Sequence, residues 1–91
     1  MRVTVLYFAA AREGAGLRSE ELELPAGATA RDALRAACAA HPQLQAIADK
    51  LRLAVDQQFA APDAPLRDRA EVALIPPVAG GAVGGAAAEE A

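Results

Sequence analysis

Four segments of the chain have the hydrophobic pattern of a β-strand. Residues 2–8 are apolar on both alternating sets, which is typical of a strand in the middle of a sheet. Residues 19–24 alternate leucines with acids and predict a second, antiparallel strand. Residues 51–55 and 71–75 predict two more. Residues 59–66 contain two prolines, which cannot donate to a ladder, so they allow only a short edge strand.

A main helix is predicted from about Ala30, where apolar residues begin to recur at three- and four-residue spacing. Thr29 and Asp32 nearly match a capping box, in which a hydroxyl and an acid satisfy the first free amides of a helix. Because the residue before a proline disfavours the α region, His41-Pro42 should end this helix, and a shorter helical piece should end near Lys50. The buried face of the main helix is expected to contain Ala30, Ala33, Leu34, Ala37 and Cys38.

These elements follow one another in the order β-β-α-β-β. After a hairpin and a helix packed on one sheet face, the later strands can join beside the first only through a right-handed crossover. We therefore expect the first and last strands to pair in parallel at the centre of a mixed sheet. The predicted fold class is α+β, in the β-grasp or ubiquitin-like arrangement with one main helix.

Composition places the end of the folded domain near Gly81. Alanine accounts for 26 of the 91 residues, so the hydrophobic fraction of 54 % overstates the core, and one domain is the limit. Beyond Gly81 the only larger hydrophobic residue is Val83. We expect residues 1–81 to form one domain, with 76–81 as a C-terminal arm, and 82–91 to be a flexible Ala/Gly-rich extension.

Charge and composition exclude several classes of function. The net charge is −3, the basic residues are scattered and aromatic residues make up 3 %, which is the opposite of a nucleic-acid-binding surface. No apolar run is long enough for a membrane span or a signal peptide, so we expect a cytoplasmic protein with no membrane partner. With one cysteine and one histidine, neither an internal disulfide nor a metal site built from such ligands is expected.

The cysteine, the histidine and an acidic run have structural explanations. Cys38, on the alanine-rich helix face, is expected to be a small core residue. His41, at the end of the helix, is expected to interact with the terminal carbonyls of that helix. Glu20, Glu21 and Glu23 are expected to form a solvated strand face.

The segment after the last strand is the most informative part of the sequence. Pro76 and Pro77 fix φ and cannot donate to a ladder, so the chain should leave the sheet as a stiff, extended arm. The arm reaches Gly80-Gly81, whose bare backbone can pass through a narrow channel and present a carbonyl to an active site that rejects any Cβ. A Gly-Gly pair alone is more typical of a flexible linker, but its place after a strand and two prolines favours the first interpretation.

Residues 1–81 resemble the small subunits of molybdopterin synthase, which are β-grasp sulfur carriers of molybdenum cofactor biosynthesis. The resemblance is strongest over residues 71–81, Glu-Val-Ala-Leu-Ile-Pro-Pro-Val-Ala-Gly-Gly. Four shorter matches support it: Val3 to Ala9 with Arg12-Glu13, the helix start at 29–34, residues 53–57, and Pro65-Leu66. Where the family usually has an Asn-Gln or Asn-Gly turn, this chain has Asp56-Gln57.

The resemblance implies a mechanism in which Gly81, preceded by Gly80, is the reactive residue. A ubiquitin-activating-like adenylyltransferase would consume ATP to convert the Gly81 carboxylate into an acyl adenylate, and a sulfur donor would displace AMP to leave a thiocarboxylate. The arm would then enter the large subunit and give its sulfur to cyclic pyranopterin monophosphate. The resemblance further implies that this chain binds no cofactor and that the catalytic side chains belong to the large subunit.

Alternation along the last strand predicts a second functional surface. If Val72 and Leu74 face the core, Ala73 and Ile75 face the side of the sheet that the single helix leaves uncovered. Phe8 and Phe59 are candidates for the same uncovered surface, although each of them, taken alone, could equally well complete the core. The resemblance implies that the large subunit and the activating enzyme bind through Phe8, Phe59 and Ile75, the ion-pair candidate Arg12, and the arm residues Pro76, Pro77, Val78 and Ala79.

The chain departs from the resembled family after Gly81. Family members end at the second glycine, whereas ten residues follow here and an amide bond to Ala82 blocks the carboxylate. A processing protease could free Gly81, residues 82–91 could be the remnant of a fusion to a large subunit, or the tail could mark an inactive copy; we favour processing. Two alternatives for function stay open, namely a sulfur carrier of thiamine or cysteine type and a ubiquitin-like interaction module with a permanent tail.

Overall fold

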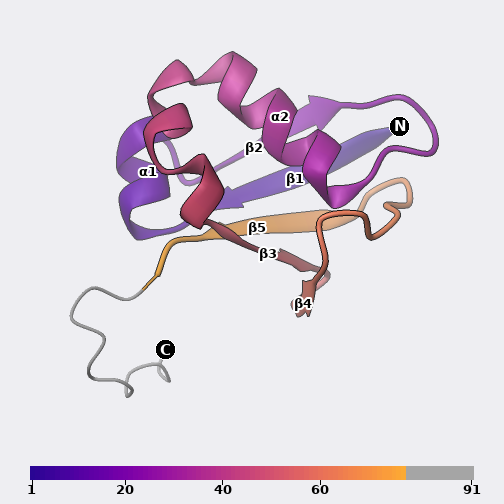
Figure 1. Ribbon diagram of the computed structural model, residues 1–91. Helices are drawn as coiled ribbons and strands as arrows, with labels where there is room; N and C mark the ends of the chain where they lie inside the picture. Colours follow the sequence, from indigo (N-terminus) through magenta and orange to yellow (C-terminus); the bar gives the residue numbers. More distant parts are fainter. Residues whose placement is uncertain (78–91) are drawn as a thin grey trace.

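The computed structural model describes residues 1–77 and shows a layer of helices over one sheet (Figure 1). None of the helices within this range is long and apolar enough to cross a membrane. The elements in chain order are β1 (Arg2–Tyr7), α1 (Ala9–Ala15), β2 (Ser19–Glu23), α2 (Ala30–Ala40), the 3₁₀ helices η1 (Pro42–Ala46) and η2 (Ala48–Lys50), β3 (Arg52–Val55), β4 (Gln58–Ala60) and β5 (Glu71–Ile75).

The five strands form one mixed sheet in the order β2-β1-β5-β3-β4. β1 pairs with β5 in parallel, with Val5 opposite Val72, and every other pair of neighbours is antiparallel. The expected parallel pairing of the first and last strands at the sheet centre is therefore confirmed, and with it the α+β class and the β-grasp arrangement.

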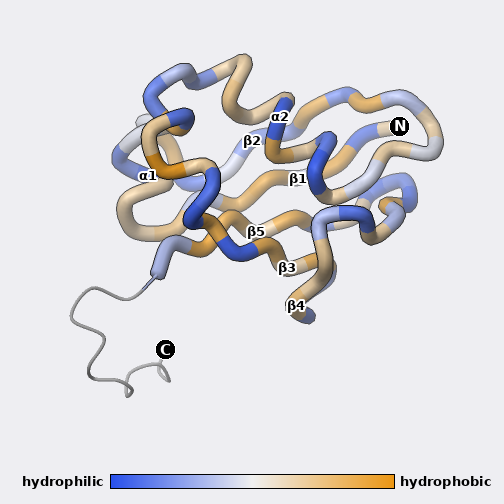
Figure 2. Tube along the Cα trace, in the orientation of Figure 1, coloured by the Kyte–Doolittle hydropathy of each residue, from blue (hydrophilic) through white to orange (hydrophobic). Residues whose placement is uncertain are grey.

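The core lies between this central pair of strands and α2. Val3, Val5 and Tyr7 of β1 and Val72 and Leu74 of β5 are at most 1 % exposed. Figure 2 shows the same arrangement, with hydrophobic strands in the middle of the sheet and hydrophilic residues on the outer turns of α2. Of the five residues expected on the buried face of this helix, Leu34 is only half-buried. The other four are the small side chains Ala30, Ala33, Ala37 and Cys38, which are buried. Their size lets the helix approach the sheet closely.

Cys38 is the core residue that the sequence predicted. It is 4 % exposed, and burial raises the pKa of its thiol. A thiol held in its neutral form is a poor nucleophile, so this side chain serves packing.

The start of α2 has the predicted capping box. The backbone N–H of Asp32 donates to Oγ1 of Thr29 at 3.4 Å, and the backbone N–H of Thr29 donates to Oδ2 of Asp32 at 2.9 Å. This second bond is the largest reason why the pKa of Asp32 lies below its ordinary value of 3.8.

Glu21 and Glu23 are exposed, as expected, but the expectations for Glu20 and His41 are wrong. These two residues form one cluster with Tyr7. The Tyr7 hydroxyl donates to Oε2 of Glu20 at 2.6 Å, and Nε2 of His41 lies 2.6 Å from the same oxygen. The side chains of Glu20 and His41 are each only about a fifth exposed. Glu20 is therefore not part of a solvated face, and the His41 ring bonds a carboxylate rather than helix carbonyls. Burial, followed by this hydrogen bond, raises the pKa of Tyr7.

Residues 9–15 form a helix that the sequence analysis did not predict. α1 has no side-chain cap and no acid in its first turn, so its local signals are weak. It ends at Gly16, which has a φ of +80°. At Gly14, an added Cβ would lie 3.1 Å from Leu44 of η1, so close packing on the buried Leu44 holds this short helix in place.

The remaining differences concern the length and type of elements. The helical piece before Lys50 consists of two 3₁₀ helices, η1 and η2. The short edge strand predicted within residues 59–66 covers Gln58–Ala60 only, because Pro62 lacks the N–H that would extend it.

The hairpin between β3 and β4 gives a first testable prediction. Its two turn residues, Asp56 and Gln57, have φ values of +50° and +73°, the geometry of a type I′ turn that favours Asn-Gly. Asp56 is held by its carboxylate, which accepts the backbone N–H of Glu71 at 3.0 Å, whereas no such bond explains Gln57. Gln57→Gly should raise the free energy of unfolding by about 0.5–1 kcal/mol, measured by urea titration.

The neighbouring substitution Gln58→Gly is the control for this prediction. Gln58 is a strand residue, so a glycine there should lower stability. An equal loss of stability in both variants would contradict the conclusion that positive φ strains Gln57.

The capping box predicts a pH dependence of stability. Because the folded-state pKa of Asp32 is lowered, its carboxylate stabilises the fold above pH 3.8, and this contribution disappears as the pH falls through the folded-state value. Asp32→Asn should therefore be less stable than the parent protein at pH 7, and the difference should shrink below about pH 4. Thermal unfolding at several pH values measures this difference in stability. Thr29→Ala, which removes the other side chain of the capping box, is the matched control. A difference that stays constant down to pH 2 would show that the charge of Asp32 does not act through the cap.

Candidate functional site

The side of the sheet opposite the helices carries an apolar surface, which we call the open face. All the helices lie on one side of the sheet (Figure 1), so side chains on the other side are uncovered. A shallow cavity of about 200 Å³ lies there, and its lining consists of Leu6, Phe8, Ala54, Gln57, Phe59, Glu71, Ala73 and Ile75. The alternation predicted for β5 is confirmed, since Val72 and Leu74 are buried in the core while Ala73 and Ile75 line this cavity.

Phe8 and Phe59 are the exposed large hydrophobic residues of the described chain. Phe8 is 39 % exposed and Phe59 is 64 % exposed, so the alternative that either one completes the core is wrong. Large aromatic side chains left in water at one site are typical of a surface that a partner covers. The structure therefore brings together three of the residues singled out from the sequence, Phe8, Phe59 and Ile75.

The backbone at the end of β1 directs Phe8 to this face. Phe8 is extended, and Ala9 directly after it has a φ of +48°, in the left-handed region that a residue with a Cβ rarely adopts. The chain therefore turns sharply between Phe8 on the open face and α1 on the helix side. The backbone N–H of Phe8 also donates to the carbonyl of Leu74 at 3.4 Å, which ties it to β5.

Arg12 lies beside the open face but does not line its cavity. It is an exposed residue of α1, and its Nε donates to the carbonyl of Tyr7 at 3.4 Å. The guanidinium is thus held near the end of β1, next to Phe8.

The arm leaves from the same end of the sheet. β5 runs parallel to β1, so its last residue, Ile75, lies at the end of the sheet where Phe8 follows β1. Pro76 is half-buried and Pro77 is exposed. The predicted arm residues Val78, Ala79, Gly80 and Gly81, and the extension 82–91, lie outside the described residues.

Arg52 was missed in the sequence analysis, although its position contains a signal. It lies two residues before Ala54 on β3, and strand alternation places both on the open face. Its guanidinium carbon lies 4.4 Å from the ring centroid of Phe59, within cation–π range. This contact orients both side chains at the rim of the open face.

The described residues offer a binding surface and no recognisable catalytic machinery. Within residues 1–77, no group of three or more His, Cys, Asp or Glu side chains could hold a metal ion. Tyr7 and Cys38 are buried in their neutral forms, and the His41 ring is engaged by Glu20. The feature of this part of the chain that suits a function is the exposed apolar surface of the open face.

The mixed sheet, the single layer of helices and the apolar open face beside the C-terminal arm define a β-grasp carrier domain. The chain belongs to the ThiS family, whose model matches residues 5–81 and so ends at the second glycine of the arm.

Similar proteins cover nearly the same span. A protein of Chlamydomonas reinhardtii named molybdopterin synthase sulfur carrier subunit is 41 % identical over 83 residues, which are 89 % of this chain and 100 % of the relative. A protein of Caenorhabditis briggsae with the same name is 37 % identical over 81 residues, covering 87 % of this chain and 96 % of the relative. The crystal structure of SAMP1 from Haloferax volcanii superposes with a TM-score of 0.83 at 30 % identity, covering 89 % of this chain and 100 % of that one.

The opposite orientations of Ile75 and Leu74 give a folding prediction. Leu74 is fully buried, so Leu74→Arg places an unpaired charge in the core and should cost more than about 4 kcal/mol, enough to unfold the domain. Ile75→Arg adds its charge on the open face and should change the free energy of unfolding by less than about 1 kcal/mol. Circular dichroism with thermal melting distinguishes the two, and unfolding of both variants would contradict the assignment of faces.

Proposed function

We propose that this chain is the sulfur carrier and small subunit of a molybdopterin synthase. The observation that carries the proposal is the 41 % identity to the whole of the Chlamydomonas reinhardtii sulfur carrier subunit. The family match that ends at Gly81, directly after the diglycine, supports it.

Gly81 supplies the reactive group in this proposal. A carboxylate is a poor electrophile, so one oxygen of the freed Gly81 carboxylate attacks the α-phosphorus of ATP, releasing pyrophosphate and forming an acyl adenylate. A donor at the oxidation level of hydrosulfide then attacks the carbonyl carbon and AMP leaves, which gives the thiocarboxylate. The thiocarboxylate sulfur attacks cyclic pyranopterin monophosphate, and water cleaves the resulting thioester, which leaves the sulfur on the pterin and restores the Gly81 carboxylate. Two carriers supply the two sulfurs of the product dithiolene. Gly80 and Gly81 lack side chains, so the arm can enter narrow active sites.

The open face supplies recognition. The adenylyltransferase and the large subunit, which contributes the catalytic side chains, both bind Phe8, Phe59 and Ile75 and take up the arm. Uptake of a segment stiffened by Pro76-Pro77 loses less conformational entropy than uptake of a flexible one. Arg12 of α1 pairs with an acidic residue of either partner, which the position of its guanidinium near the end of β1 supports.

Activation requires a free Gly81 carboxylate, and in the sequence Gly81 is joined to Ala82. We propose that a protease removes residues 82–91. The small side chains on both sides of this bond leave the backbone accessible to a cleaving enzyme.

The likeness to SAMP1 favours a second candidate function. That protein is named a small archaeal modifier protein, and its structure covers 89 % of this chain. The same acyl adenylate, or a thioester made from it, would then be attacked by an amine of another protein, and Gly81 would end in an amide bond to that protein. The two candidates share activation and differ in the nucleophile that takes the glycyl group.

Replacement of the small subunit in cells that lack their own tests the proposal. Residues 1–81 should restore molybdopterin synthesis, measured as molybdopterin in cell extracts. Deletion of Gly81 should abolish synthesis because the chain then ends at Gly80, and its carboxylate falls one residue, about 3.5 Å, short of the active site. Ile75→Arg should reduce synthesis at least tenfold because a charge is buried at the partner interface.

Arg35→Gln is the matched control, because Arg35 is an exposed residue of α2 on the other side of the sheet, and it should leave synthesis unchanged. If the chain that lacks Gly81 restored molybdopterin synthesis, the proposal would be contradicted. If the functional chain were found joined through Gly81 to other proteins and had no effect on molybdopterin, the modifier function would replace it.

A further inference from the structure

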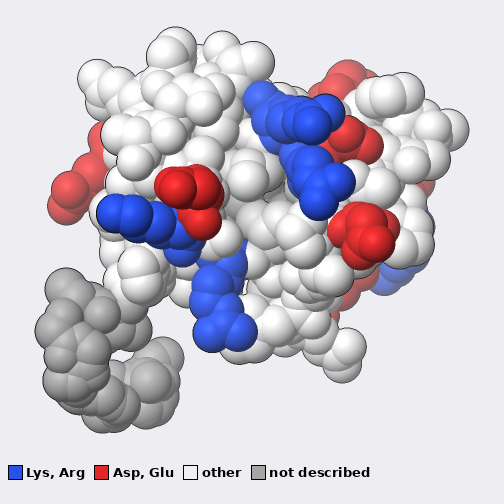
Figure 3. Space-filling view, viewed as in Figure 1, with Lys and Arg blue, Asp and Glu red and all other residues white. Residues whose placement is uncertain are grey.

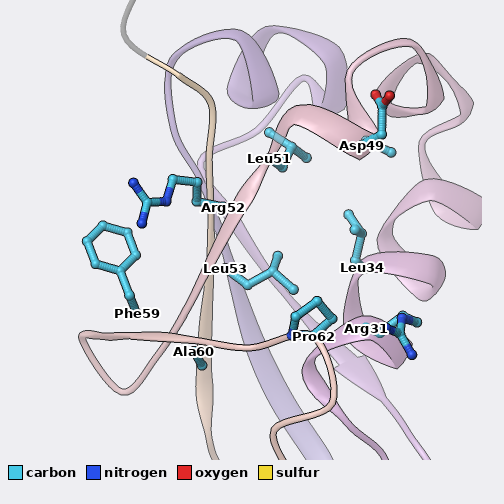
Figure 4. A pocket seen from close by; sticks show the side chains of 10 residues that line it. Arg31, Leu34, Asp49, Leu51, Arg52, Leu53, Phe59, Ala60 and Pro62 are labelled. Atoms are coloured by element: carbon cyan, nitrogen blue, oxygen red, sulfur yellow. The ribbon is translucent and has the colours of Figure 1, made fainter.

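A second cavity, which we call the edge groove, lies at the edge of the sheet where α2 and β3 diverge, and residues of both faces of the sheet line it. Its volume is about 320 Å³, and its apolar walls come from Leu34 of α2, Leu51 and Leu53 at the start of β3, and Pro62. Figure 4 shows these side chains converging from the helix and from the strand on the space between them. Small-molecule sites start at roughly 300 Å³. The edge groove thus has room for one or two side chains of a partner.

Two arginines flank the edge groove. Arg31, at the start of α2, and Arg52, on β3, lie on opposite sides of it (Figure 4). Figure 3 shows the same arrangement on the surface, with basic side chains over α2 and over the start of β3 and uncharged surface between them. Within residues 1–77, no carboxylate oxygen lies within 4 Å of a nitrogen of either arginine.

The Arg52 guanidinium is already oriented for a ligand. Its carbon lies 4.4 Å from the centroid of the Phe59 ring, a cation–π contact that holds the guanidinium in place without using its N–H groups in an ion pair. A carboxylate can accept two of these N–H groups at once. Asp49 of η2 also lines the edge groove and gives it a negative end. The site therefore favours acidic groups at the arginines and disfavours them beside Asp49.

The strand at the edge groove has an open edge. β4 pairs with β3 only from Leu53 opposite Ala60 onward, because the chain turns away at Pro62. On one side, Arg52 pairs with Ile75 of β5. On its other side, no strand of the described residues pairs with it. An open strand edge beside apolar side-chain space suits an extended peptide better than a compact small molecule.

The edge groove continues into the open face. Phe59 lines both cavities, and with Arg52 it forms the ridge between them. A partner that covers the open face therefore reaches the edge groove by passing a single pair of side chains.

We propose that the edge groove binds an extended segment of the same protein partner that covers the open face. In this segment, an aliphatic side chain fills the space between Leu34, Leu51 and Leu53, and acidic residues on either side of it pair with Arg31 and Arg52. The inference rests on the proposed function for the identity of the partner, but the recognition chemistry comes from the groove itself.

A peptide titration tests the recognition chemistry. The probe is a capped peptide of sequence Asp-Asp-Leu-Val-Glu-Glu, added to methyl-labelled protein and followed by NMR. Methyl shifts should appear at Leu34, Leu51 and Leu53 as the peptide approaches about 1 mM, the weak range typical of an isolated short segment. Arg31→Gln and Arg52→Gln should each weaken binding about five- to tenfold, the loss of one charge-assisted hydrogen-bonded pair. Arg35→Gln, the matched loss of an arginine outside the groove, should not.

Two results would overturn the recognition chemistry. One is a set of shifts confined to the open face, at Leu6 and Ile75, or no shifts at all. The other is an equal loss of binding in Arg35→Gln, which would mean that only the general charge of the protein attracts the peptide. The peptide with Asn and Gln in place of its acids should bind at least tenfold more weakly, and equal binding would contradict the role of the arginines.

Photo-crosslinking in the protein's own cells tests the identity of the partner. A benzophenone side chain placed at Pro62 in the edge groove should capture the same protein as one placed at Phe59. The crosslink from Pro62 should map to a segment of that protein in which an aliphatic residue lies between acidic residues. Capture of different proteins at the two positions would overturn the claim of a shared partner. Neither result depends on sulfur transfer, so the replacement experiment with Gly81 deleted decides the proposed function separately.

Discussion

The parallel pairing of β1 with β5 is the constraint on which the rest of the structure depends. It joins residues about 67 positions apart, Val5 and Val72, and places both strands in the middle of the sheet. Their inward side chains are five of the six largest fully buried ones, and α2 covers them with alanines and Cys38. In a chain so rich in alanine, few other residues could supply that buried area. Loss of this pair would remove the core and the exit direction of the arm together.

The same pairing creates the functional surfaces. Because all the helices pack on one side, the other side of β1 and β5 presents Phe8, Ala73 and Ile75 to a partner (Figure 1). Parallel strands end at the same edge, so the arm starts next to the aromatic residue that follows β1. For the proposed sulfur carrier, this topology keeps the recognition surface and the start of the arm side by side.

Much of this arrangement could be predicted from local pattern. The alternation of residues 71–75 indicated which side chains of the last strand face away from the core, and Thr29 with Asp32 indicated where α2 begins. Both signals depend on neighbours within a few residues. The surface role of Phe8 and Phe59 followed from the resemblance, and the structure then resolved the choice between surface and core.

The features that were missed depend on contacts between distant residues. α1 has no side-chain cap at its start and is stabilised by packing of Gly14 against Leu44. Glu20 and His41 are 21 residues apart, and only the fold brings them to 2.6 Å. The edge groove combines the start of α2 with β3 and Pro62, so no single segment of the sequence indicates it. In each case the decisive contact is a product of the topology.

The central claim is that Gly81 becomes a reactive C-terminus that carries sulfur. Intact mass spectrometry of the untagged protein isolated from its own cells tests it most directly. The account predicts a chain that ends at Gly81, with a fraction in which one oxygen has been replaced by sulfur. A population that uniformly retains residues 82–91 would contradict it, because an amide-bonded Gly81 cannot be adenylated.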